Sequence, residues 1–211
     1  MALAWMHSGG AYQMAGYTAV TFFGYGGWGI RDYFIGQADR FTFAEAFTAN
    51  QLALVHQLQT RYPKNTGVNI DEFDIESAPE LEKQLRQRTG ITDDNEFGLL
   101  WDRDTVAFYG DPAWEARMVK TREQAWTQKL SERHGTWTLE ITTNTKGNWG
   151  GRPVVQFLPY RLKNVRILNG ADLQPVITDN FILVPLSGEF EKDKRLKVVF
   201  TAKKIRPGSS F

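Results

Sequence analysis

Residues 2–29 read ALAWMHSGGAYQMAGYTAVTFFGYGGWG and contain no charged side chain. The stretch lacks the basic start of a signal peptide, and glycines and polar residues interrupt it before it reaches the roughly 20 apolar residues of a membrane span. It therefore predicts no signal peptide and no membrane span. Instead we expect an apolar helix at residues 1–8, a buried strand at residues 11–17 and a glycine-rich loop at residues 24–29.

The clearest helix follows at residues 42–62. Thr42 is a good N-cap and Glu45 stands three residues later, which is the spacing of a capping box, while Pro63 ends the pattern. Further along we expect an exposed helix at residues 78–89 closed by Gly90, a loop at residues 91–101, a strand at residues 105–109 and a connector of mixed character at residues 113–130.

From Gly135 onward the sequence changes character. Runs rich in β-branched and aromatic residues alternate with turn dipeptides such as Asn169-Gly170, a pattern typical of a small antiparallel β-sandwich. Residues 135–206 hold 12 Lys and Arg against 6 Asp and Glu, an excess of six positive charges. That excess fits either an acidic partner or ordinary solvated strand faces.

Composition excludes several kinds of site. The 211 residues contain no cysteine, so the chain has no disulfide, no thiolate metal centre and no cysteine nucleophile. The net charge of +1 argues against a nucleic-acid-binding protein, which usually carries a large basic excess. The three histidines, His7, His56 and His134, stand in separate predicted elements and do not indicate a histidine metal site. Acidic residues at 71–76 and 93–96 could hold calcium, although neither group has EF-hand spacing.

Three segments, taken in order, resemble part of a known protein family. They are residues 2–29 above, residues 40–58 (RFTFAEAFTANQLALVHQL) and residues 104–118 (DTVAFYGDPAWEARM). This succession resembles the C-terminal half of the catalytic domain in gingipain-like, caspase-fold cysteine peptidases. In that family a helix and a Gly-Gly-Ala step follow the strand that bears the catalytic cysteine, and a Gly-Asp-Pro turn closes the domain.

The resemblance implies an α/β fold class. A partial caspase-like three-layer α/β/α domain would occupy residues 1–130, and an immunoglobulin-like β-sandwich would occupy residues 135–206. The catalytic histidine and cysteine of the family precede the matching segments, so no catalytic residue can be assigned in this chain. The resemblance places the loop after the first strand beside a substrate pocket, with Tyr17, Thr18, Tyr25 and Trp28 as the candidate pocket residues.

The resemblance also suggests partners. A peptidase-like half of this kind would pack against the upstream half of its domain, or self-associate through the open edge of its sheet, and would bind a peptide substrate once completed. A secreted or cell-envelope location would follow if the chain is a fragment of such a protein.

The alternative is a non-catalytic binding or structural module. The β-sandwich would then contact a surface or polymeric ligand, with Trp149 in a glycine-rich loop as the candidate contact residue. In that case the α/β part would serve as a platform.

Overall fold

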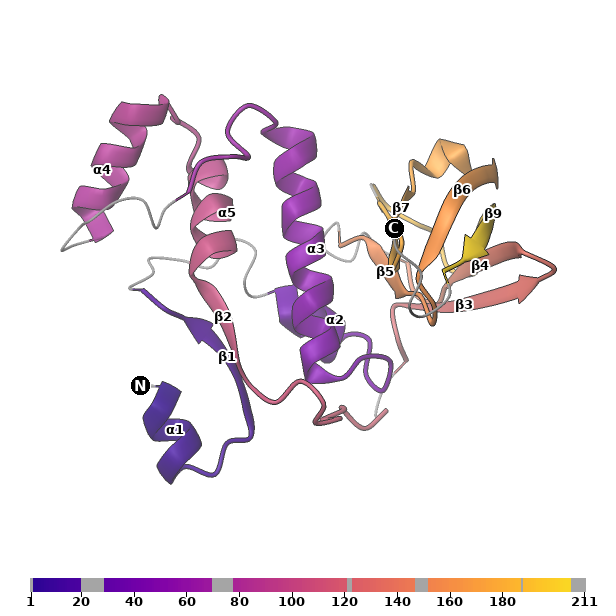
Figure 1. The fold of residues 1–211 in the computed structure, drawn as a ribbon, viewed down its shortest axis with the longest axis horizontal. Coiled ribbons are helices and arrows are strands. Elements are labelled where there is room, and N and C mark those ends of the chain that lie inside the picture. The colour runs from indigo at the N-terminus through magenta and orange to yellow at the C-terminus, as the bar shows by residue number, and fades with distance from the viewer. Residues whose placement is uncertain are drawn as a thin grey trace. The chain divides into compact units, whose positions relative to one another are not determined.

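The computed structural model describes residues 2–19, 29–69, 78–120, 123–146, 152–186 and 188–205. The chain divides into two compact units, Met1–Lys120 and Thr121–Phe211, called here the first and the second unit (Figure 1). The second unit therefore begins earlier than residue 135, because a strand at Trp126–Arg133 belongs to it.

Within its described residues, the first unit combines helices with one antiparallel strand pair, so it mixes α and β structure. Strands β1 and β2 pair from Gln13 opposite Gly110 to Tyr17 opposite Val106. The expected buried strand at residues 11–17 is shorter and only half buried, since β1 has a single partner strand among the described residues. The elements are α1 (Ala2–Ser8), β1 (Gln13–Tyr17), α2 (Ile30–Phe34), α3 (Phe43–Arg61), α4 (Ala78–Thr89), α5 (Asp94–Thr105) and β2 (Val106–Gly110).

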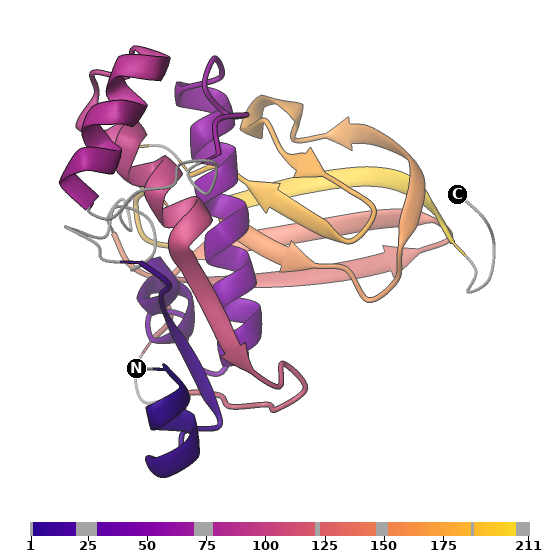
Figure 2. The same ribbon diagram turned by 60° about the vertical axis from the view of Figure 1, so that its left-hand side comes forward.

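Helix α3 confirms the capping-box prediction. The Glu45 backbone N–H donates to the Thr42 hydroxyl oxygen at 3.1 Å, and the Thr42 backbone N–H donates to the Glu45 carboxylate at 2.7 Å. The helix ends at Arg61, just before Tyr62 and Pro63. Its inner face packs beside α5, as both views show (Figures 1 and 2). The shared core comprises Leu54, Leu58, Leu85, Ile91, Phe97, Leu99, Leu100 and Trp101.

The loop expected at residues 91–101 is wrong, because most of that segment is helix α5. Asp93 caps the helix by accepting from the Asn95 backbone N–H at 2.8 Å. Phe97, Leu100 and Trp101 then recur at helical spacing and are buried against α3 and α4. Helix α4 matches its predicted bounds, and Gly90 follows it with the positive φ of a helix-ending residue.

The second unit consists of two antiparallel sheets. One has the strand order β3-β4-β9-β6 and the other β5-β8-β7. The sequence leaves residues 113–130 ambiguous between strand and a helical or extended connector, and in the structure residues 126–130 belong to β3, which pairs with β4 along its whole length. The strands are β3 (Trp126–Arg133), β4 (Thr136–Thr143), β5 (Val154–Phe157), β6 (Leu162–Asn169), β7 (Val176–Ile177), β8 (Phe181–Val184) and β9 (Arg195–Lys204), with a short helix η3 (Ala171–Leu173).

Both sheets of the second unit contribute to one hydrophobic core. Leu139 on β4, Val154 on β5, Ile182 on β8 and Phe200 on β9 are all fully buried. Burial alternates along β4 and along most of β9, so one face of the four-stranded sheet is apolar and the other is exposed. The long strands β3, β4 and β9 run beside one another in Figure 2.

Candidate functional site

A small apolar pocket lies against β1 in the first unit. Its volume is about 180 Å³, below the range of pockets that take drug-sized ligands, so it suits one side chain or a comparably small group. Among the lining residues that the structure describes, Arg31 is the one with a charge, and the other lining atoms are mainly apolar. The lining residues are Ala15, Gly16, Tyr17, Ile30, Arg31, Phe43 and Val106.

Tyr17 is a lining residue, and its hydroxyl is already engaged. The hydroxyl donates to a carboxylate oxygen of Asp102 on α5 at 2.8 Å, and Asp102 is fully buried. This bond joins the sheet to the helix beneath it and fixes the ring of Tyr17 at the pocket. Tyr17 therefore offers a ring surface to a ligand rather than a free hydroxyl.

Thr18 stabilises the β1–β2 pair and is not a lining residue of the pocket. Its backbone N–H and its hydroxyl both donate to the carbonyl oxygen of Thr105, at 2.7 and 3.1 Å. These bonds continue the β1–β2 pairing by one residue. The other two pocket candidates, Tyr25 and Trp28, lie outside the described residues, and so does the candidate ligand contact Trp149.

Sequence reasoning missed Arg31, Phe43 and Val106 as pocket residues. Arg31 could have been singled out from the sequence, because it is the first charged residue after 30 uncharged ones. Phe43 had no such signal, since it reads as an ordinary apolar residue in the first turn of α3. Only the folded chain brings α2 and α3 to the side of β1 where the pocket lies.

The histidines remain apart in the structure. His7 is in α1, His56 is in α3, and His134 is in the turn between β3 and β4. Partial burial lowers the pKa of His56, which favours the neutral imidazole. In the described part of the chain, no three His, Asp or Glu side chains gather as a metal site would require. The acidic residues 71–76 lie outside the described residues.

The acidic residues at 93–96 form the start of α5, where each carboxylate has a partner. Asp93 accepts from the Tyr62 hydroxyl at 2.8 Å, and Glu96 accepts from the Asn65 side-chain amide at 2.8 Å. Asp94 pairs with Arg86 of α4 at 2.5 Å. Acidic side chains at a helix N-terminus are also stabilised by the helix dipole. These contacts give the acidic group a structural role without calcium.

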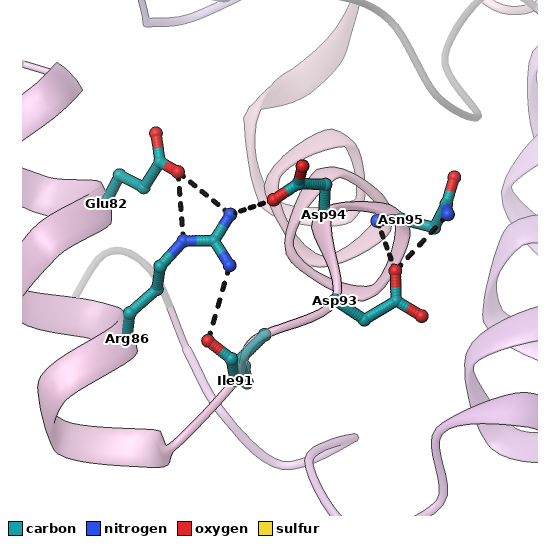
Figure 3. Close-up of polar contacts among 6 residues, drawn as sticks. All are labelled: Glu82, Arg86, Ile91, Asp93, Asp94 and Asn95. Atoms are coloured by element: carbon teal, nitrogen blue, oxygen red, sulfur yellow. Dashed lines mark hydrogen bonds and ion pairs between the residues drawn. The ribbon is translucent and has the colours of Figure 1, made fainter.

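Arg86 links α4 to the start of α5. Its guanidinium donates to the Glu82 carboxylate at 2.9 Å, to Asp94 and to the Ile91 carbonyl oxygen at 3.3 Å (Figure 3). It also lies 5.1 Å from the centre of the Phe97 ring. Because one planar group satisfies acceptors on both helices, Arg86 holds the α4–α5 corner in place.

No family model, curated protein or solved structure matches this chain. Among the described residues, no helix is both long and apolar enough to cross a membrane.

The Tyr62–Asp93 contact predicts a pH-dependent contribution to stability. The hydrogen bond to Asp93 raises the pKa of Tyr62, and the same bond, with the Asn95 backbone N–H, lowers the pKa of Asp93. A carboxyl whose folded pKa is depressed stabilises the fold above its unfolded pKa of about 3.9, and this contribution is lost as pH falls through the folded value. Tyr62→Phe should therefore lower Tm at neutral pH, and the difference from the unsubstituted protein should shrink in acid.

Thermal melts followed by circular dichroism between neutral pH and about pH 2.5 would measure this effect. Tyr12→Phe is the matched control, because Tyr12 is exposed and contacts Trp114 by ring stacking. A Tm loss in Tyr62→Phe that is equal at every pH would contradict the prediction and assign the loss to packing.

Proposed function

We propose that this chain is a peptide-binding unit of caspase-fold peptidase type that holds a peptide without cleaving it. The order of elements supports the proposal: an apolar helix, a strand, a long capped helix and a strand that enters Gly110-Asp111-Pro112. A second unit of two packed antiparallel sheets follows, which fits a trailing β-sandwich of immunoglobulin type. The finer three-layer α/β/α arrangement would be completed by an upstream half of the domain.

The pocket beside β1 is the observation that carries this proposal. Three consecutive residues of β1, Ala15 to Tyr17, belong to its lining, so a peptide extended along β1 would pass the pocket. An apolar side chain of that peptide would enter the pocket, and Arg31 would attract a carboxylate next to it. Peptides commonly bind in this way, with main-chain bonds for affinity and one pocket for specificity.

β1 also offers main-chain groups to such a peptide. The Thr18 N–H points to β2, so the N–H and C=O groups of Gly16 and Met14 point there too, two residues apart. The groups of Gln13, Ala15 and Tyr17 then point to the opposite edge, where no described strand pairs with them. An upstream half, a second copy of the chain or a bound peptide could each use this edge.

Binding without cleavage follows from the chemistry of the residues. The sequence has no cysteine, and none of the described lining residues of the pocket is a serine, threonine or histidine. Nucleophilic peptide cleavage needs a nucleophile and a base within hydrogen-bond reach of each other. We therefore assign the pocket a recognition role.

Filling the pocket tests the proposal. Gly16→Val adds side-chain volume at a lining position, and its first carbon would meet only the end of Met14, at an ordinary 3.6 Å. Pools of labelled pentapeptides with Leu, Phe or Asp at the centre would be titrated by fluorescence polarisation. We expect the Leu or Phe pool to bind best. Gly16→Val should weaken that binding by about tenfold or more, because a mismatch of even one methylene group in a hydrophobic pocket has an effect of that size.

Gly67→Val is the control, because Gly67 is exposed in a turn with open space around it. Equal binding by the Gly16 and Gly67 variants would exclude the pocket as the peptide site. The same peptides would be checked for cleavage by chromatography. Hydrolysis that His7→Ala or Ser8→Ala abolishes would overturn the proposal that the chain does not cleave peptides.

A further inference from the structure

The exposed face of the four-stranded sheet in the second unit is strongly basic. Burial alternates along β4 and most of β9, and strand pairing assigns the outward positions of β3 and β6. Seven cations lie at the outward positions of this sheet, and all of them are exposed. We call this set the basic face: Lys129, Arg133, Lys163, Arg166, Arg195, Lys197 and Lys203.

The strand register gathers these cations into rows. Arg133 and Arg166 lie at the two ends of one row, with Thr136 and Thr201 between them. Lys163 and Lys203 lie directly opposite each other in the adjacent row. Neighbouring strands are about 4.8 Å apart, and alternate residues along a strand are about 7 Å apart, so several cations fall within one short stretch of polymer.

Most of these charges have no acidic partner among the described residues. Glu140 is the one carboxylate at the outward positions of the described strands, and it lies 3.8 Å from Lys197. The other six cations make no ion pair within the described residues. Like charges directly opposite on a sheet destabilise the pair, so Lys163 and Lys203 impose a cost that a bound anion would remove.

We propose that the basic face binds an acidic polysaccharide, a polymer that carries both carboxylate or sulfate groups and hydroxyls. Apart from Val199 and Glu140, the positions of β3, β4 and β9 between the cations carry threonine or serine side chains, which can donate to and accept from sugar hydroxyls. These residues are Thr127, Ser131, Thr136, Thr138, Thr142 and Thr201.

A single-stranded nucleic acid fits this face less well. Proteins that bind single strands combine basic grooves with aromatic rings on which the bases stack. No described residue at the outward positions of these four strands is aromatic. The inference is independent of the peptide-binding proposal, because it concerns other residues in the other unit.

The test removes three neighbouring cations of the basic face and measures binding to named probes. Lys163→Gln, Arg166→Gln and Lys203→Gln would be combined in one variant. Binding to polygalacturonate, chondroitin sulfate, a short single-stranded DNA and neutral dextran would be measured by calorimetry at about 50 and 200 mM NaCl. A second triple variant, Arg61→Gln, Lys64→Gln and Lys120→Gln, makes the same charge change in the first unit and serves as the control.

The unsubstituted protein and the control are expected to bind an acidic polysaccharide with an affinity that falls as salt rises. In the basic-face variant the affinity should fall, and the slope of log K against log salt should decrease by about one for each lost contact. Its Tm should stay equal or rise, because repulsion between Lys163 and Lys203 is relieved. Polygalacturonate carries carboxylates alone and chondroitin sulfate carries carboxylates and sulfates, so tighter binding of chondroitin sulfate would indicate that sulfate contributes.

Three results would overturn the inference. Equal loss of affinity in both triple variants would mean that net charge alone drives binding. If neutral dextran bound as tightly as the acidic polysaccharides, charge would not be what drives binding. Tighter binding of the single-stranded DNA than of either acidic polysaccharide would reassign the basic face to nucleic acid.

Discussion

Gly110→Ala is expected to destabilise the first unit by about 3 kcal/mol or more, a large part of the stability of a typical domain. Gly110 has φ +112°, a conformation in which an L side chain is strained. A Cβ at this position would also lie 2.3 Å from the carbonyl oxygen of Tyr12 and 3.1 Å from Cα of Gln13. Because both neighbours are backbone atoms at the end of the β1–β2 pair, relief of the clash requires the strands to separate.

Gly90→Ala separates the two causes of this effect. Gly90 also has a positive φ, +73°, but a Cβ there would meet no atom within 4 Å. We expect it to cost about 1 kcal/mol from backbone strain alone. Urea denaturation of both variants gives the comparison. Equal losses would show that the contact with Tyr12 is relieved without disturbing the strand pair.

Phe200→Ala should cost the second unit about 3–5 kcal/mol in free energy of unfolding, the usual range for deleting a buried phenylalanine ring. Phe200 is fully buried in the middle of β9, and its ring stacks on Trp137 with 6.2 Å between the ring centres. The core around it includes residues of both sheets, so the cavity cannot be closed by moving one strand.

Phe200→Leu should lose clearly less than Phe200→Ala, since it keeps most of the apolar volume. Ile167→Ala, on β6, is the surface control, because Ile167 is 36% exposed. Urea titrations of these variants followed by near-ultraviolet circular dichroism would measure the losses. A loss below about 1 kcal/mol in free energy of unfolding for Phe200→Ala would show that the Phe200 ring contributes little to the stability of the second unit.

Elements with a local signal could be predicted from the sequence. Thr42, Glu45 and Pro63 define α3 by themselves, and the structure confirms that helix. Helix α5 was missed because its cap, Asp93, lies in an acidic stretch that reads as a solvated loop. Strand β3 was missed because its outward positions are polar or charged, and only pairing with β4 makes it a strand.

The candidate site was predicted less well, because a pocket depends on contacts between distant segments. Tyr17 lines the pocket beside β1, but its bond to Asp102 crosses 85 positions of sequence and has no local signature. Thr18 is not among the lining residues, and both of its hydrogen bonds go to Thr105. A substrate role for either residue stays a prediction. Periodicity reports which face of an element is buried, and it does not report what the face is buried against.

The Gln13 side chain has a consequence for how the protein is made. Its amide donates to the carbonyl oxygens of Asp111 and Trp114, residues 98 and 101 positions later. During synthesis β1 can therefore pair with β2 only after β2 and the following turn have left the ribosome, whereas β3 and β4 are joined by a short turn. The first unit depends on long-range closure, a slow step of folding. A nascent chain that stalls before residue 114 lacks these contacts of β1, and unpaired strand edges favour aggregation.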